Sequence, residues 1–127
     1  VCLLVERVGE ILDQALGERR GIVRFGSAYA PLDEALCRGV VDLSGRPCAA
    51  INLGLKREML GSLACENVPH FFQSLAFASR NCIHLTVLAG ENDHHRAEAA
   101  AKALALALRQ AVALDGTDVV PSTKGAL

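Results

Sequence analysis

The sequence predicts an α+β fold in which a mixed sheet of four strands carries two helices packed on one face. Apolar residues recur at helical spacing in some segments and alternate with other residues in the rest. After a first helix, the expected order is β-β-β-α-β-α, so the remaining helices come late, as in α+β layers. The length of 127 residues and the lack of a low-complexity linker indicate a single α+β domain over residues 1–127.

The chain is expected to begin with a helix followed by a strand. Residues 3–16 place apolar side chains at helical spacing, and Gly17 follows as a helix stop. Residues 21–31 alternate and end at a proline, which indicates a strand. Residues 31–36 are then expected to form a turn or a single helical turn.

Two further β-like segments follow, at residues 36–43 and 47–55. The short polar connection Ser-Gly-Arg-Pro at residues 44–47 separates them. A connection of this length and composition predicts that the two segments form an antiparallel hairpin.

The second half of the chain is expected to alternate helix, strand and helix. Residues 68–78 have apolar side chains at helical spacing, and residues 81–89 alternate as a strand before a break at Gly90. A long alanine-rich helix follows over about residues 93–113. These elements complete the predicted α+β layer.

The composition indicates a packed core and argues against polyanionic partners. Hydrophobic residues make up 51% of the chain but aromatic residues only 4%, so the core must be built from Ala, Leu and Val. Lys and Arg number 13 against 14 Asp and Glu. This near balance leaves no excess of positive charge that would attract nucleic acid or an anionic membrane.

The cysteines and the ends of the chain bear on location. The 5 cysteines show no C-x-x-C spacing and are typical of a reducing compartment. No apolar run is long enough to span a bilayer and no signal-peptide pattern is visible, so we expect a cytoplasmic protein. The chain starts in an apolar segment without an initiator Met, and we expect it to be a fragment of something longer.

The start of the last helix is the clearest candidate site. Asn92 or Asp93 is suited to cap this helix. Glu98 would then lie one turn beyond His94 and His95, which is a metal-ligand spacing. Adjacent histidines point about 100° apart on a helix, so each could serve a different ion with Glu98 between them. The alternative is a solvated polar helix start without a metal.

A second candidate site lies in the C-terminal segment 121–125, Pro-Ser-Thr-Lys-Gly. It offers two hydroxyl groups, an ammonium group and a flexible glycine within five residues. Such donors suit an anion such as phosphate. An ordinary solvated tail is the alternative.

Seven short motifs occur in order along the chain. They are residues 24–26, 32–36, 41–47, 69–72, 90–98, 107–111 and 121–125. Together they resemble the imidazoleglycerol-phosphate dehydratase family of histidine biosynthesis, over about residues 15–127. The resemblance implies two similar α+β halves, each a four-stranded sheet with two helices on one face. This chain would be one half-repeat plus part of the preceding helix.

The resemblance also implies a site with two manganese ions. His70, His94, His95 and Glu98 would be metal ligands, and His95 and Glu98 would be catalytic. The remaining histidine, His84, has no matching family role and is interpreted as structural. The residues implied to bind the substrate phosphate are Arg24, Arg46, Lys102, Ser122 and Lys124.

The implied activity is that of a carbon–oxygen lyase. The family removes water from D-erythro-imidazoleglycerol phosphate to give imidazole-acetol phosphate. The resemblance further implies a homo-oligomeric shell of twenty-four subunits with active sites between subunits. The small phosphorylated substrate would be the partner, with no nucleic acid and no membrane.

The match fails at the first helix. The family's other His-His-x-x-Glu motif falls on residues 2–7, where both histidines are replaced and Glu6 is the candidate for the surviving glutamate. A truncated, catalytically inactive fragment that binds metal or oligomerises is therefore the alternative function. A nucleic-acid-binding α+β domain is a third hypothesis, which the balanced charge disfavours.

Overall fold

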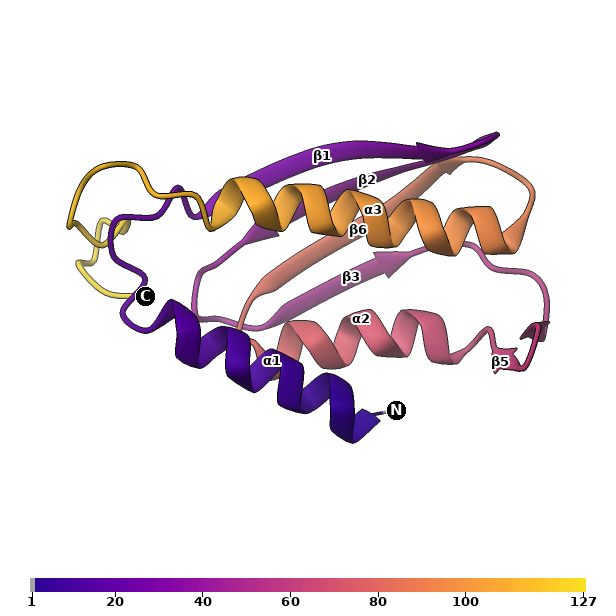
Figure 1. Cartoon of the computed structure of the whole chain (residues 1–127), viewed down its shortest axis with the longest axis horizontal. Coiled ribbons are helices and arrows are strands. Elements are labelled where there is room, and N and C mark those ends of the chain that lie inside the picture. Colours follow the sequence, from indigo (N-terminus) through magenta and orange to yellow (C-terminus); the bar gives the residue numbers. More distant parts are fainter. Residues whose placement is uncertain (1) are drawn as a thin grey trace.

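A computed structural model describes residues 2–127 and contains, within that range, three helices and six strands (Figure 1). In chain order they are α1 (Cys2–Leu16), β1 (Phe25–Leu32), β2 (Ala35–Asp42), β3 (Cys48–Asn52), β4 (Met59–Leu60), β5 (Leu63–Ala64), α2 (Asn67–Ala78), β6 (Cys82–Ala89) and α3 (Asp93–Ala111). Among the described residues, none of the helices combines the length and the apolar character needed to cross a bilayer.

Four of the strands form one mixed sheet in the order β1-β2-β6-β3. The pairs β1–β2 and β2–β6 are antiparallel, whereas β3 and β6 are parallel. Helix α3 lies along β1 and β2 and helix α2 along β3, both on the same face, and α1 packs against α2 (Figure 1). The predicted α+β fold with a four-stranded mixed sheet and two helices on one face is confirmed.

The predicted hairpin between residues 36–43 and 47–55 is wrong. Strand β6 lies between β2 and β3, so β3 pairs in parallel with β6 instead of antiparallel with β2. A parallel pair requires a crossover connection, and α2 provides it. The turn residues 44–47, which predicted the hairpin, instead connect β2 to β3 past the end of β6.

The antiparallel hairpin joins β1 and β2. Leu32 pairs with Ala35, so Asp33 and Glu34 form a two-residue connection, and Asp33 has a positive φ of 46°. Positive φ at the centre of a two-residue connection is typical of the turns that match the twist of hairpin strands. Residues 31–36 therefore form the predicted turn, and the alternative of a helical turn is wrong.

Helix α3 approaches the sheet closely because small residues face one another. Ala103 and Ala107 are fully buried on its inner face, at 0% exposure. A Cβ at Gly26 of β1 would lie 1.9 Å from the carbonyl oxygen of Ala107. A Cβ at Gly39 of β2 would lie 2.9 Å from the carbonyl carbon of Ala103. The helix backbone is therefore in contact with the strand backbone at these two positions.

Replacing Gly26 with alanine should destabilise the fold, because the added methyl group would overlap the backbone of α3. We expect Gly26→Ala to lower the free energy of unfolding by roughly 1–3 kcal/mol, as overpacked sites do. Ser27→Ala changes the neighbouring, exposed position and should stay within about 0.5 kcal/mol of the parent. Urea unfolding followed by circular dichroism measures both; equal stability of the two variants would contradict this packing.

Candidate metal-binding and phosphate-binding sites

Asn92 caps α3, which confirms one of the two predicted alternatives. Its side-chain oxygen Oδ1 accepts hydrogen bonds from the backbone N–H groups of His94, at 2.9 Å, and His95, at 3.3 Å. These donors would otherwise have no partner in the first turn of a helix. The cap therefore fixes the backbone of both histidines at the start of the helix.

Asp93, the other capping candidate, is buried and binds a different segment. Its Oδ2 accepts the backbone N–H groups of Lys56, at 2.8 Å, and Arg57, at 2.7 Å. Burial alone would raise the pKa of the Asp93 carboxyl, but these two hydrogen bonds and the charges of Arg57 and Arg96 lower the pKa below its usual value. Asp93 thus holds the loop after β3 against the start of α3 as a carboxylate.

Arg96 binds the same loop from the next turn of α3. Its Nη1 donates to the carbonyl oxygens of Leu53, at 3.0 Å, and Gly54, at 2.6 Å. Its Nε donates to the carbonyl oxygen of Gly90, at 2.8 Å. Together with Asp93, it fixes the position of the helix start relative to the ends of β3 and β6.

His94 and Glu98 form a pair on one face of α3. His94 Nε2 lies 3.4 Å from Glu98 Oε2, and Lys102 Nζ lies 3.1 Å from Glu98 Oε1. His94 and Glu98 border a groove of about 390 Å³ between α2 and α3, whose walls include Phe71 and Phe72. Lys102 therefore contacts Glu98 within the same helix.

His95 points toward the tip of the β1–β2 hairpin instead. Its Nδ1 is hydrogen-bonded to the Glu34 carboxylate, and its Nε2 lies 3.6 Å from Asp33 Oδ2. Glu34 also accepts the backbone N–H groups of Glu91, at 2.8 Å, and Asn92, at 3.1 Å. The His95 hydrogen bond first, and then the two backbone donors, lower the pKa of Glu34 to about 2.

The two histidines therefore diverge, as their adjacent positions predict. Their ring centroids are 6.0 Å apart and their planes are inclined by 63°. Glu98 contacts His94, while Glu34 lies beside His95. The sequence did not predict the role of Glu34, because its partner His95 is 61 positions away. The only signal was an acidic pair inside one of the seven motifs.

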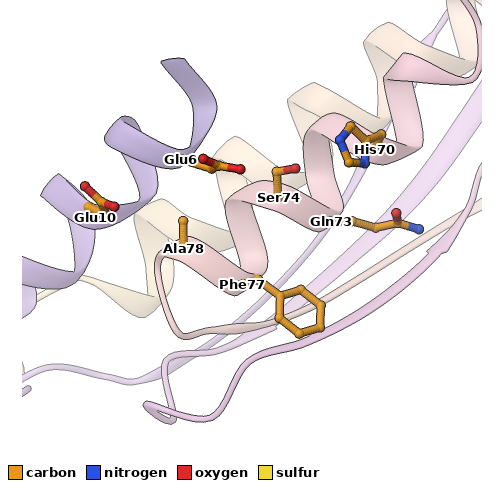
Figure 2. A pocket seen from close by; sticks show the side chains of 7 residues that line it. All are labelled: Glu6, Glu10, His70, Gln73, Ser74, Phe77 and Ala78. Atoms are coloured by element: carbon orange, nitrogen blue, oxygen red, sulfur yellow. The ribbon is translucent and has the colours of Figure 1, made fainter. Parts of the chain in front are cut away.

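His70 lies on α2, away from His94 and His95. It borders a pocket of about 620 Å³ between α1 and α2, together with Glu6 and Glu10 of α1 and Gln73 of α2 (Figure 2). Within residues 2–127, His70, His94, His95 and Glu98 do not converge to a cluster of three ligand atoms. A complete metal centre would need ligands beyond those that this chain brings together.

Arg24 anchors the C-terminal segment at the opposite end of the sheet. Its Nε and Nη2 donate to the Asp42 carboxylate at 2.7 and 3.2 Å, and its Nη1 donates to the carbonyl oxygen of Pro121 at 2.7 Å. The tail is further held where the Gly21 N–H donates to the carbonyl oxygen of Val119 at 3.0 Å. Arg24 and the segment 121–125 are thus brought together, as expected.

The loop that carries Arg46 lies against the same tail. A Cβ at Gly45 would lie 2.8 Å from the backbone carbon of Leu127. Within the tail, the Lys124 N–H donates to Ser122 Oγ at 3.2 Å, which shapes a tight turn. Four of the five predicted phosphate-binding residues, all except Lys102, therefore belong to segments that meet at this end.

The two groups of residues lie at opposite ends of α3. This helix has 19 residues, so at 1.5 Å per residue it is about 28 Å long. His94, His95 and Glu98 lie near its first residue, and the C-terminal segment follows its last turn (Figure 1). One copy of the chain cannot place both groups around the same small molecule.

The chain has an α+β fold with a four-stranded mixed sheet. A histidine–carboxylate group lies at one end of this sheet, and a segment with cationic and hydroxyl side chains lies at the other. The family described as Imidazoleglycerol-phosphate dehydratase matches residues 5–108. The chain belongs to this family, which confirms the resemblance of the seven motifs.

Several relatives of this chain share the family's name. Imidazoleglycerol-phosphate dehydratase of Kluyveromyces lactis is 58% identical over 120 residues, which cover 94% of this chain and 54% of that protein. The protein of the same name from Saccharomyces cerevisiae is also 58% identical, with the same coverage of 94% and 54%. The chain thus spans about half the length of the curated relatives it matches.

Solved structures of the family have the same fold as this chain. Imidazoleglycerol-phosphate dehydratase from Staphylococcus aureus gives a TM-score of 0.82 at 34% identity, over 89% of this chain and 69% of that one. The structure from Pyrococcus furiosus, in complex with (S)-C348, gives a TM-score of 0.81 at 39% identity, over 99% and 71%.

Removing the Asp93 side chain should destabilise the chain and detach the 53–57 loop. Because two backbone donors lose a charged acceptor, we expect Asp93→Ala to lower the free energy of unfolding by roughly 2 kcal/mol at pH 7. Glu91→Ala removes an adjacent, exposed carboxylate and is the matched control. Since the folded pKa of Asp93 is lowered, its contribution is full above the unfolded pKa of about 3.9 and is lost as the pH falls through the folded pKa.

Urea unfolding at a series of pH values measures this effect. The stability difference between Asp93→Ala and the parent should shrink on acidification, whereas that of Glu91→Ala should be small throughout. A difference that stays constant down to pH 2 would contradict an ionised Asp93 as the source.

Proposed function

We propose that the protein carrying this chain is a hydro-lyase that converts imidazoleglycerol phosphate to imidazole-acetol phosphate in histidine biosynthesis. The observation that carries the proposal is the capped start of α3, where one histidine is paired with Glu98 and the next with Glu34. Membership of the family, whose model matches residues 5–108, also supports the proposal. A dehydration assay on this substrate, with and without manganese, tests it directly; no activity in the metal-loaded protein would overturn it.

The donor set at the start of α3 fits manganese. The available atoms are imidazole nitrogens and carboxylate oxygens, and the groups found beside them include no thiol. We assign His94 and Glu98 to one ion and His95 to another, with His70 contributing from α2. The ions would supply Lewis-acid stabilisation of negative charge on the reacting substrate.

Neighbouring side chains of this chain would orient those ligands. The bond from Glu34 to Nδ1 orients the His95 ring and leaves Nε2 as its ligand atom. Lys102 holds Oε1 of Glu98, so that Oε2 faces His94. Glu98 and His95 remain the proposed catalytic groups, and Lys102, which holds Glu98, keeps its proposed role as a phosphate contact in a site shared between copies.

The phosphate would bind at the other end of the sheet. Ser122 and Lys124 supply a hydroxyl and an ammonium group, and Arg46 lies on the adjoining loop. Arg24 already uses three of its nitrogens to hold Asp42 and the tail, so its proposed role is to position that tail beside the phosphate. Arginine suits such planar, multiple contacts.

We further propose that the active site forms between copies of the chain in a homo-oligomer such as a twenty-four-subunit shell. The length of α3, about 28 Å, supports this, because the metal end of one copy must meet the phosphate end of another. A reducing cytoplasm is the proposed location, in keeping with five cysteines that are all unpaired.

A catalytically inactive metal-binding or oligomerisation fragment is the second candidate. It is favoured by α1, which carries Cys2 and Leu3 where the family motif implies two histidines. Glu6 does lie on the same pocket as His70, so one carboxylate remains available there (Figure 2). Manganese binding without turnover would support this candidate over the enzyme.

Replacing His94 should weaken manganese binding. We expect His94→Ala to raise the dissociation constant for manganese at least about tenfold, because the side chain beside Glu98 is lost. Assembly should fall with metal content if the ions lie between subunits. Electron paramagnetic resonance measures free manganese and light scattering the assembly, with Glu91→Ala as control; an intact, manganese-replete assembly of His94→Ala would contradict the assignment.

Active sites shared between copies should permit complementation. His94→Ala removes the metal end and Lys124→Ala the phosphate end, so each variant alone should be nearly inactive. Coexpressed in equal amounts, they should regain about one quarter of the parent activity, since a quarter of two-component sites would receive both intact ends. Activity no higher than that of the separate variants would contradict sites shared between two copies.

A further inference from the structure

Three ligating side chains meet on the sheet face that α2 and α3 leave uncovered. Cys48 begins β3, Cys82 begins β6, and the two residues are direct partners in the parallel ladder. Two residues beyond Cys82, on the same side of β6, lies His84. The two sulfur atoms and one imidazole nitrogen all lie within 4.8 Å of one another. Among residues 2–127, this is the cluster whose geometry suits a metal ion.

This cluster is separate from the manganese ligands proposed above. Strand neighbours alternate between the two faces, and Ile83, which lies between Cys82 and His84, is buried beneath the helices at 1% exposure. The cluster also lies at the beginning of β6, whereas His94 follows the end of that strand. Two of its three ligands are thiols, whereas His94 and His95 are paired with carboxylates.

We propose that Cys48, Cys82 and His84 bind a thiophilic divalent cation of the zinc type, with water at the fourth position. Two thiolates and one imidazole form a ligand set used by zinc sites that keep one position open. In such a tetrahedral site the ligand atoms are about 3.7 Å apart, so side chains whose ligand atoms lie within 4.8 Å need to close by at most about 1 Å. This interpretation replaces the purely structural role expected for His84.

The surroundings of the cluster bear on how it would bind a cation. Burial, and next the neighbouring Cys48 thiol, raise the pKa of Cys82 to about 11. On coordination both S–H bonds break and the two protons pass to solvent, which leaves two thiolates that neutralise the dication. Asp42 stands opposite Cys82 on β2, but Arg24 binds both of its carboxylate oxygens. Water, and not Asp42, is therefore assigned to the fourth position.

Cadmium reports this site through its thiolate charge-transfer absorption in the near ultraviolet. We titrate the purified chain, kept reduced with a phosphine, with Cd²⁺ alone and expect the band to saturate at one equivalent. Cys48→Ser should abolish the band, and His84→Gln should weaken binding about tenfold or more. Cys2→Ser removes an exposed cysteine of α1 and should leave the band unchanged. No band in the parent, or an unchanged band in Cys48→Ser, would overturn the proposal.

A measurement on the parent chain avoids any question of variant folding. Saturating Zn²⁺ should slow alkylation of Cys48 and Cys82 by iodoacetamide at least about tenfold, while Cys2 reacts at the same rate with or without zinc. Peptide mass spectrometry reads the three sites in one sample. Equal protection of all three cysteines, or of none, would contradict a site at Cys48 and Cys82.

One variant separates this site from the proposed dehydratase centre. His94→Ala should retain the full cadmium band, whatever happens to its manganese binding or its activity. Loss of the band in His94→Ala would place the thiolate-bound ion elsewhere and overturn the proposal. Lack of dehydratase activity in the parent would overturn only the proposed function.

Discussion

The contact between the backbone of α3 and the backbones of β1 and β2 is the constraint on which the rest of the structure depends. Gly26 and Gly39 leave no side chain between them and the alanine face of the helix. This explains how a chain with few aromatic residues forms a core, since close packing of small groups replaces large side chains. It also determines the direction of α3, and hence which residues lie at each end of the sheet.

The start of α3 is fixed by polar contacts that the core alone would not provide. Asp93 and Arg96 bind the backbone of the loop after β3, and Glu34 reaches across from the β1–β2 hairpin. Three segments that are distant in sequence therefore converge on one helix turn. The position of this candidate metal site therefore depends on residues that hydrogen-bond to the ligands and to the helix start as much as on the ligands themselves.

The sequence predicted the fold class, the order of the main elements and the helix cap, because these depend on local periodicity and on capping chemistry, but it did not predict the short strands β4 and β5. It failed where long-range pairing decides the outcome. The insertion of β6 between β2 and β3 overturned the predicted hairpin, and Glu34 beside His95 was missed. Lys102 contacts Glu98, and its role at the phosphate, implied by the family resemblance, stays a prediction. The roles of His70, His94, His95 and Glu98 remain predictions.

The attachment of the C-terminal segment has an entropic consequence. Arg24 holds Pro121, Gly21 holds Val119, and the Gly125 N–H closes a turn onto the carbonyl oxygen of Ser122. These contacts hold the segment in place through the chain's own residues. Ordering a flexible residue opposes binding by about 1–2 kcal/mol of backbone entropy, and here that ordering is completed during folding. An anion that binds Ser122 and Lys124 would therefore retain more of its contact energy as affinity than it would on a disordered tail.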